Sequence, residues 1–406
     1  MLGIYFGLDS GLIQRRDSMN KKIIWFLIIA TCSLFLGCSD FFSSSGEGEI
    51  DILWRKNDSP IYIDSCFVVP VGKTLFIEPG VEVRFKAGRY GHNYNFLEVG
   101  MLHIKGNIIA RGTRNDSIVF TRNGDEYSWA VICIDSTSTD KNIFQYCKML
   151  YSGEVNNYPI ERDSKRYSLG GSICLCRSTA EIKNCFLEEN LYGLFLYNSN
   201  GTKISNSTFK NYGCDIVCEE ECALINVEGN TFINNVSGEL TGSIISYNSC
   251  LTIVMNNFNG YSYAIYCRDK GIYCVEDNTF EGNHYGVYCV DVSGGNVINN
   301  KMINNVYSLL FVETDINIIN NLFTNNQVGI GCVQLSDPFI LNNTISISET
   351  AISGYCGLYL WCCSDPIIYN TIVTGYEKFL GNLYQDTYNN RPTITNSFVK
   401  SDTLPD

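Results

Sequence analysis

Ile182-Lys183-Asn184-Cys185-Phe186 is the first clear copy of a phrase that recurs along most of this chain. Each copy holds an apolar, mostly β-branched residue, then Asn, then Phe or a large aliphatic residue. The copies end at positions 186, 209, 232, 258, 280, 302, 323, 345, 372 and 398, in steps of 21 to 27 residues. A repeat of about 22 residues without helical periodicity is typical of a solenoid, in which each turn of the chain lies on the previous one.

Stacked turns would place equivalent side chains in vertical columns. In Gly286-Val287-Tyr288-Cys289, Val287 and Cys289 fall on one face of a strand and Tyr288 on the other. We expect a core column of Phe209, Phe232, Phe258, Phe280 and Phe323. We also expect one Asn per turn to accept left-handed backbone and to stack as an amide ladder, at Asn184, Asn230, Asn256, Asn278, Asn300, Asn321, Asn343, Asn370 and Asn396.

The 19 cysteines do not indicate a disulfide framework. Cys32 and Cys38 belong to the N-terminal signal described below, which leaves 17, an odd number that cannot all pair. Aligning the turns puts Cys in one register with other apolar residues, at Leu196, Cys218, Ile245, Cys267, Cys289, Phe311, Cys332 and Leu360. We interpret these thiols as buried apolar filler. The cluster Cys214-x3-Cys218-x3-Cys222 lacks the Cys-x2-Cys spacing of zinc sites, which disfavours a metal there.

Residues 19–38 have the composition of an export signal. A basic start at Met19-Asn20-Lys21-Lys22 precedes the apolar run Ile23 to Leu36, and the segment ends in Gly37-Cys38-Ser39. This ending resembles a bacterial lipoprotein signal, although Phe35 stands where Leu is usual. The resemblance implies cleavage before Cys38 and diacylglycerol on its sulfur. The alternative is an uncleaved anchor helix.

We therefore expect residues 1–37 to be a signal peptide, with the true start at Met19, and residues 38–52 to be a flexible tether. In such lipoproteins Ser39 after the lipidated Cys favours the outer membrane. The prediction is a bacterial cell-envelope, outer-membrane lipoprotein, periplasmic or surface-exposed, that contacts the membrane through its N-terminal lipid.

Residues 60–400 resemble the right-handed parallel β-helix repeat proteins of the pectate-lyase-like superfamily. The most specific stretch runs from Val69-Pro70-Val71-Gly72 through Glu78-Pro79-Gly80 to Phe85, followed by Leu97 to Leu102 and Ile118 to Thr121. This stretch is similar to the first coils of bacterial β-helix lipoproteins. The resemblance and the period together predict an all-β chain whose residues 53–406 form a right-handed, single-stranded parallel β-helix of about 14 coils.

Composition and motifs exclude several functions. The formal net charge of −13 offers no basic patch to phosphates, so we expect no nucleic-acid partner. The signatures of polygalacturonase-type hydrolases and of arginine-centred lyases are absent, and only three His are present. We assign no catalytic residue, and the sequence leaves the oligomeric state open.

One constellation of side chains could bind a ligand. Two residues past the aligned Cys position, consecutive turns carry Asp269, Asp291 and Glu313, which would stack about 5 Å apart. Stacked carboxylates attract a cation, and calcium is the natural one for oxygen ligands. Tyr266 and Tyr288 beside them would form a platform for a sugar ring. The alternative is that these are merely solvated turn acids and surface tyrosines.

Three functions remain open. The first is a non-catalytic protein that binds or displays at the cell surface, with a polysaccharide as favoured ligand and calcium as its only candidate cofactor. The second is a polysaccharide lyase or epimerase of the pectate-lyase-like superfamily that uses Asp269, Asp291 and Glu313. The third is a purely structural or adhesive rod. The fold hosts all three, so the fold alone does not choose between them.

Overall fold

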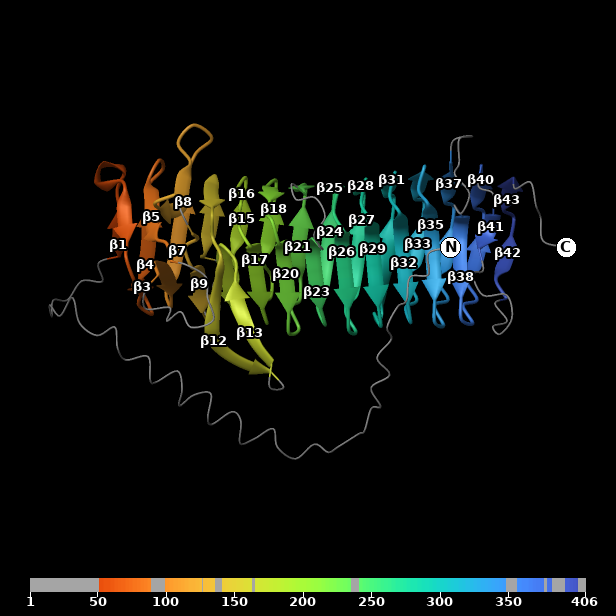
Figure 1. Ribbon diagram of the computed structural model, residues 1–406, viewed down its shortest axis with the longest axis horizontal. Coiled ribbons are helices and arrows are strands. Elements are labelled where there is room, and N and C mark those ends of the chain that lie inside the picture. The colour runs from red at the N-terminus through yellow and green to blue at the C-terminus, as the bar shows by residue number, and fades with distance from the viewer. Residues whose placement is uncertain are drawn as a thin grey trace, which may run out of the picture. The chain divides into compact units, whose positions relative to one another are not determined.

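The computed structural model describes residues 51–88, 99–125, 127–135, 141–162, 165–234, 241–347, 356–375, 378–381 and 391–400 (Figure 1). All of them belong to one compact unit of residues 49–406. The predicted signal peptide, the lipidated Cys38 and the tether up to residue 50 lie outside the described residues. Within the described part of the chain, no helix is long and apolar enough to cross a membrane.

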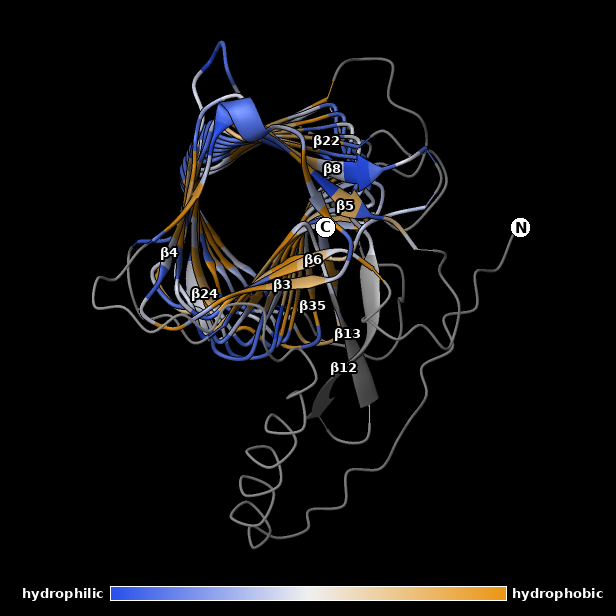
Figure 2. Ribbon diagram, turned by 90° about the vertical axis from the view of Figure 1, so that its left-hand side faces the viewer, coloured by the Kyte–Doolittle hydropathy of each residue, from blue (hydrophilic) through white to orange (hydrophobic). Residues whose placement is uncertain are grey.

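Three long parallel sheets make up the unit, and Figure 2 looks along the stack of coils. Each coil contributes one strand to sheet A, then one to sheet B, then one to sheet C, and each strand pairs in parallel with its equivalent in the next coil. Sheets A and B have 14 strands each and sheet C has 13. This is a right-handed parallel β-helix, as the sequence predicts.

Sheet A consists, in spatial order, of β1 (Ile52–Trp54), β4 (Thr74–Ile77), β7 (Asn107–Arg111), β10 (Ile143–Gln145), β15 (Glu181–Lys183), β18 (Lys203–Ser205), β21 (Ile225–Glu228), β24 (Cys250–Val254), β27 (Ile272–Glu276), β30 (Gly294–Ile298), β33 (Asn317–Ile319), β36 (Phe339–Leu341), β39 (Ile367–Tyr369) and β42 (Thr393–Thr395).

Sheet B consists of β2 (Ile61–Ile63), β5 (Glu82–Lys86), β8 (Ile118–Asn123), β11 (Cys147–Leu150), β16 (Phe186–Glu188), β19 (Thr208–Lys210), β22 (Thr231–Ile233), β25 (Asn257–Asn259), β28 (Thr279–Glu281), β31 (Lys301–Ile303), β34 (Leu322–Thr324), β37 (Thr344–Ser346), β40 (Ile372–Thr374) and β43 (Phe398–Lys400).

Sheet C consists of β3 (Cys66–Val69), β6 (Met101–Ile104), β9 (Ile132–Asp135), β14 (Ile173–Cys176), β17 (Tyr192–Tyr197), β20 (Cys214–Glu219), β23 (Gly242–Tyr247), β26 (Tyr263–Arg268), β29 (Tyr285–Val290), β32 (Tyr307–Val312), β35 (Val328–Val333), β38 (Cys356–Trp361) and β41 (Lys378–Gly381). The strands β12 (Glu154–Arg162) and β13 (Lys165–Gly170) form an antiparallel hairpin, and a short 3-10 turn spans Lys56–Asp58.

The predicted start of the helix needs a small correction. β1 begins at Ile52, one residue before the predicted boundary, and Leu53 at its centre pairs with Phe76. Trp54, at the end of β1, is already buried in the core.

The aromatic core column is confirmed from Phe209 onward. The ring centroids of Phe209, Phe232, Phe258 and Phe280 are 4.9, 4.8 and 4.8 Å apart, and all four side chains are buried. Met302 lies between Phe280 and Phe323 in this column. At the first copy the predicted register is wrong by one, because Leu187, and not Phe186, pairs with Phe209.

The predicted Asn ladder is present, but its two predicted roles belong to different residues. One residue of a coil carries the buried amide, and another has the left-handed backbone. In the buried ladder, each side-chain oxygen after the first accepts hydrogen bonds from the preceding Asn, as Asn278 does from Asn256 (2.8 and 3.0 Å). The ladder comprises Asn230, Asn256, Asn278, Asn300, Asn321 and Asn343. Left-handed backbone falls elsewhere, including at Asn184, Asn370 and Asn396. The prediction that one Asn performs both roles is therefore wrong: the ladder residues do not have left-handed backbone, and those three left-handed residues lie outside the buried ladder.

The interior cysteines behave as predicted, with one correction. Cys218, Cys267, Cys289 and Cys332 are buried and occupy one register with Leu196, Phe311 and Leu360. In the coil of β23 this position belongs to Ser246, so the predicted Ile245 is wrong by one residue. Ile245 lies on the opposite face of sheet C, against the second apolar cluster described below.

Candidate functional site

A group of aromatic side chains lies on the outer face of sheet C. Tyr263 and Tyr266 on β26 pair in register with Tyr285 and Tyr288 on β29, and Tyr307 on β32 continues the first column. The ring centroids are 5.0 Å apart for Tyr263–Tyr285, 5.2 Å for Tyr285–Tyr307 and 5.3 Å for Tyr266–Tyr288. All five side chains are half-buried. We call these five residues the tyrosine face.

The sequence predicts only Tyr266 and Tyr288 of this group, and the structure places both of them outward and side by side. Tyr263, Tyr285 and Tyr307 were missed, as was His284, whose ring lies 4.5 Å from Tyr285 between centroids. Burial lowers the pKa of His284 and raises that of Tyr285 to about 12, so both side chains are neutral near pH 7.

The predicted carboxylates line the edge of the tyrosine face. Asp269, Asp291 and Glu313 follow β26, β29 and β32, are exposed, and all have left-handed backbone. The N–H of Asp269 donates to the carbonyl of Val290, one residue before Asp291, so the acids sit at equivalent points of successive coils. Arg268 Nε lies 3.5 Å from an Asp269 oxygen. These acids can contribute hydrogen bonds to a ligand on the rings.

The acids do not converge on one point. Among the described residues, only one group of three or more His, Cys, Asp or Glu brings its ligand atoms within 4.8 Å of one another, and Asp269, Asp291 and Glu313 do not form it. Calcium at these acids stays a prediction.

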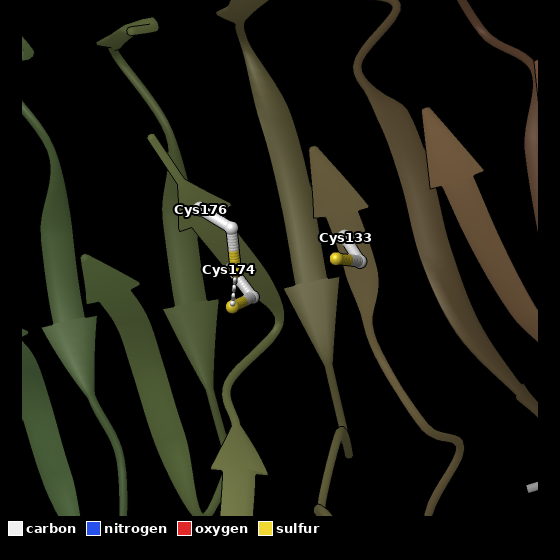
Figure 3. Close-up of side chains that lie close together, drawn as sticks. All are labelled: Cys133, Cys174 and Cys176. Atoms are coloured by element: carbon white, nitrogen blue, oxygen red, sulfur yellow. Dashed lines mark hydrogen bonds between the residues drawn. The ribbon is translucent and has the colours of Figure 1, made fainter. Parts of the chain in front are cut away.

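That one group is a set of three thiols in an earlier part of sheet C. Figure 3 shows Cys174 and Cys176 on β14 and Cys133 on the neighbouring strand β9. Cys133 and Cys174 are paired in register, and Cys176 lies two residues further along the same strand. The Sγ atoms of Cys174 and Cys176 are 3.6 Å apart. We call these three residues the thiol cluster.

The thiol cluster lies on the face of sheet C that is turned away from the helix core. Ile132, Ile134, Ile173 and Leu175 alternate with the thiols and belong to the core, whereas the thiols belong to a second apolar cluster. Other members of that cluster are Met101, Ala130, Val131, Phe195 and Val217. The exposed fractions of Cys133, Cys174 and Cys176 are 2, 0 and 8 %. Water is therefore nearly excluded, with Cys176 nearest to solvent.

The three thiols share their protons unequally. Hydrogen bonds from Cys133 and Cys174 hold the pKa of Cys176 well below the usual thiol range. Hydrogen bonds with Cys133 and Cys176, together with burial, raise the pKa of Cys174 well above it. Of the three thiols, Cys176 is therefore the one that most readily loses its proton.

The sequence did not reveal this cluster. Cys214, Cys218 and Cys222 are the local group whose spacing disfavours a metal, and these three do not bring their sulfur atoms within 4.8 Å of one another. The signal that could have found the thiol cluster is the pair Cys174 and Cys176, two residues apart on one strand face.

Together, the three parallel sheets and the repeat in the sequence define a right-handed parallel β-helix protein. Residues 134–318 match the family described as "Periplasmic copper-binding protein (NosD)". The matched segment includes Cys174, Cys176 and the tyrosine face, and it begins one residue after Cys133. No curated protein is significantly similar in sequence.

Among solved structures, the periplasmic alginate epimerase AlgG is similar, with a TM-score of 0.48 and 11% identity over 86% of this chain and 83% of that one. The catalytic domain of a GH87 alpha-1,3-glucanase has a TM-score of 0.44 and 11% identity, over 82% of this chain and 69% of that one. The surface protein and adhesin PfbA of Streptococcus pneumoniae has a TM-score of 0.38 and 14% identity, over 83% and 92%.

Proposed function

We propose that this chain is a lipid-anchored β-helix protein of the bacterial cell envelope that binds a polysaccharide on its tyrosine face. The export signal with Cys38 and the matched family, described as periplasmic, support an envelope location. The observation that carries the ligand class is the tyrosine face, in which five half-buried rings from three consecutive coils form one continuous aromatic surface.

Aromatic rings of this kind suit sugars for a physical reason. The C–H face of a pyranose is apolar, and it gains from covering a tyrosine ring whose own hydroxyl stays in contact with water. Consecutive coils repeat at about 4.8 Å, so one chain of sugars running along the helix axis could stack on several rings in succession. Arg268 and the acids at the edge would bond to hydroxyl groups at the rim of the stacked chain.

We favour binding without catalysis because the sequence lacks the signatures of polygalacturonase-type hydrolases and of arginine-centred lyases. Tyr285 is neutral near pH 7, and the three acids beside the rings do not bring their oxygen atoms within 4.8 Å of one another. Glycoside hydrolysis needs two carboxyl groups that face each other across the scissile bond. A lyase or epimerase using Asp269, Asp291 and Glu313 is the alternative that the experiment must separate.

The test uses the full chain, purified in detergent, and a panel of neutral and uronic-acid polysaccharides. Affinity electrophoresis identifies a ligand, and calorimetry with an oligosaccharide of that ligand gives Kd. Tyr288→Ala removes one central ring and should weaken binding about tenfold, which corresponds to roughly 1.4 kcal/mol. Tyr62→Ala is the matched control, because Tyr62 is exposed on sheet B, away from the tyrosine face.

Each other outcome points to another function. Unsaturated product absorbance from a uronic-acid polysaccharide, with or without calcium, would show a lyase. Equal binding by wild type and Tyr288→Ala would move the ligand away from the tyrosine face. No binding to any member of the panel would favour a structural or adhesive rod.

A further inference from the structure

Cys133 and Cys174, two members of the thiol cluster, are placed so that a disulfide bond could join them. They are paired in register on the adjacent parallel strands β9 and β14 and lie on the same face of sheet C. Neighbouring strands are about 4.8 Å apart, which is inside the range of about 4.4 to 6.8 Å between the Cα atoms of a disulfide. The two sulfur atoms already lie within 4.8 Å of each other. Rotation of the two side chains would therefore bring them into bonding distance without moving the backbone.

The second sulfur contact of Cys174 suits a transient bond better than a lasting one. Cys174 and Cys176 lie on one strand, and their Sγ atoms are 3.6 Å apart. Two residues of an extended strand, however, advance about 6.6 Å, which is near the upper limit for the Cα atoms of a disulfide. A lasting bond here would distort β14, which is paired with strands on both sides. The stable disulfide of the cluster should therefore join Cys133 to Cys174.

Burial separates the roles of the three thiols. Cys133 and Cys174 are almost fully buried, so an oxidant has almost no access to them, whereas Cys176 is 8 % exposed. Hydrogen bonds from Cys133 and Cys174 also lower the pKa of Cys176. Because the thiolate is the attacking species in thiol–disulfide exchange, Cys176 is the thiol that an external oxidant would meet and react with first.

The side chains beside Cys176 make its exposed edge polar. Asp135 is paired in register with Cys176, and its charge opposes a negative charge on that sulfur. Arg177 acts in the opposite direction, and its Nη2 lies 3.3 Å from one oxygen of Asp135. The other oxygen of Asp135 lies 3.9 Å from Nε2 of His103. Polar groups thus line the edge at which a polar oxidant would reach Cys176.

We propose that the thiol cluster is a disulfide relay: Cys176 reacts with an external disulfide, and the bond then moves to Cys174 and Cys133. The Cys176 thiolate attacks a disulfide RSSR, forms a mixed disulfide and releases one RS⁻. Cys174 loses a proton and attacks the sulfur of Cys176, which releases the second RS⁻ and forms the Cys174–Cys176 bond. Cys133 then loses a proton and attacks the sulfur of Cys174, and Cys176 leaves as a thiolate. The two protons combine with the two RS⁻, so one RSSR becomes two RSH and the protein gains one disulfide.

The oxidant that this relay needs is a disulfide compound, such as the oxidised form of a thiol peptide or a disulfide-exchange protein. This step rests on the envelope location of the proposed function, because an oxidising envelope supplies such disulfides. The final bond would close the coil that carries the antiparallel hairpin of β12 and β13. Closing a long segment limits the unfolded chain, so oxidation should stabilise this part of sheet C.

The test uses the full chain, purified in detergent, fully reduced and then exposed to oxidised glutathione in a buffer that contains a metal chelator. Samples are alkylated at intervals, and peptide mass mapping locates the disulfides. We expect a Cys133–Cys174 bond as the final product, with Cys176 free to be alkylated. Cys176→Ser should slow the formation of this bond at least about a hundredfold, because the buried pair loses its accessible partner. Cys289→Ser, a buried thiol of the core column, is the matched control and should change the rate less than about twofold, because distant coils affect the cluster little.

The wild-type time course tests the relay without any variant that fails to fold. Glutathione should appear on Cys176 before the Cys133–Cys174 bond forms, and Cys133→Ser should accumulate the earlier Cys174–Cys176 bond or glutathione on Cys176. A final Cys174–Cys176 bond in wild type would overturn the proposal, as would an unchanged rate in Cys176→Ser or three free thiols after prolonged exposure. These outcomes are independent of where the protein is located and of any polysaccharide. Failure of the proposed function would instead show as a protein that is not exported or binds no polysaccharide, with the relay intact.

Discussion

At the scale of single residues, this protein repeatedly places polar groups inside a β-helix and satisfies them with neighbours from adjacent coils. The ladder from Asn230 to Asn343 does so with neutral amides. Asp215 on β20 is a buried carboxyl group, 1 % exposed, whose partners come from its own coil and from two coils further on. Its Oδ2 accepts a 2.6 Å hydrogen bond from the Tyr261 hydroxyl, and its Oδ1 accepts one from Asn211 Nδ2 at 2.9 Å.

Asp215 should make the stability of the β-helix depend on pH. Burial raises its pKa from 3.8 to about 7, although hydrogen bonds from Tyr261 and Asn211 act in the opposite direction. Because the folded state holds the proton more tightly, this group contributes stability that is complete below pH 3.8 and is lost as pH rises through about 7. Between pH 5 and pH 7 the loss is up to about 3 kcal/mol.

Asp215→Asn removes this dependence, so urea unfolding midpoints at pH 5 and pH 8 should differ less in the variant than in wild type. Asp58→Asn, at an exposed position in the 3-10 turn, is the control and should follow wild type. If the profile of Asp215→Asn runs parallel to that of wild type, Asp215 does not titrate in this range.

Register errors of one residue mark the limit of sequence reasoning at this scale. Aligning the turns on glycine places Gly242 with Gly286 and so predicts Ile245 in the column. In the structure Gly242 instead pairs with Cys214 and Tyr263, one position earlier, so Ser246 takes the place. Since side chains alternate with period two, such a slip exchanges the inner and outer faces of a strand. Tyr263 was missed because it and Tyr266, three residues apart, both face outward, with Ala264 and Ile265 both buried between them.

At the scale of elements, the bends between sheets hold the coils in register. Each ladder Asn lies between the sheet A strand and the sheet B strand of its coil. Asn278 is an example: its Nδ2 donates to Asn300 Oδ1 at 3.1 Å and to the carbonyl of Ile253 at 2.8 Å. Its Oδ1 accepts from the backbone N–H of Asn256 and from Asn256 Nδ2. Every hydrogen-bonding group of this buried amide is thus satisfied.

Asn278→Ala should therefore destabilise the protein by about 3–5 kcal/mol, because it leaves several buried groups of adjacent coils without partners. The measurement is the free energy of unfolding in urea. Asn257→Ala is the matched control, since Asn257 is exposed on β25, and its effect should stay within about 0.5 kcal/mol. Equal effects of the two substitutions would show that the ladder does not hold the coils together.

Insertions between elements explain why the thiol cluster could not be predicted. The repeated phrase starts at Ile182, downstream of all three thiols. Between Cys133 and Cys174 the chain also adds the antiparallel hairpin of β12 and β13. No period therefore relates the two positions, and their pairing follows only from the strand register of β9 and β14. The tyrosine face lies where coils are 22 residues long, which is why two of its members were predicted.

At the scale of the whole molecule, the repeat was enough to predict the architecture, because one strand pairing repeated coil after coil fixes the fold. The repeat alone could not assign a function. The outer face of sheet C carries two unrelated groups of side chains, and they lie on different coils. The thiol cluster lies on β9 and β14, and the tyrosine face lies on β26, β29 and β32. A solenoid permits this separation because each coil contacts mainly its neighbours, so a site on one coil constrains distant coils little.

Because a change at one part of the chain affects distant coils little, the membrane anchor can be tested separately from the fold. Cys38 precedes the first described strand in the sequence, so Cys38→Ala should leave the far-ultraviolet circular dichroism and the urea midpoint unchanged. It should also move the protein from the membrane fraction to the soluble fraction. Each buried CH₂ of an acyl chain contributes about 0.8 kcal/mol to membrane binding, so loss of the lipid should abolish retention. The direct check is the mass of the N-terminal peptide from the native host, which should carry a diacylglyceryl group on Cys38. A peptide that begins at residue 1 or 19, or membrane retention of Cys38→Ala, would instead indicate an uncleaved apolar segment as the anchor.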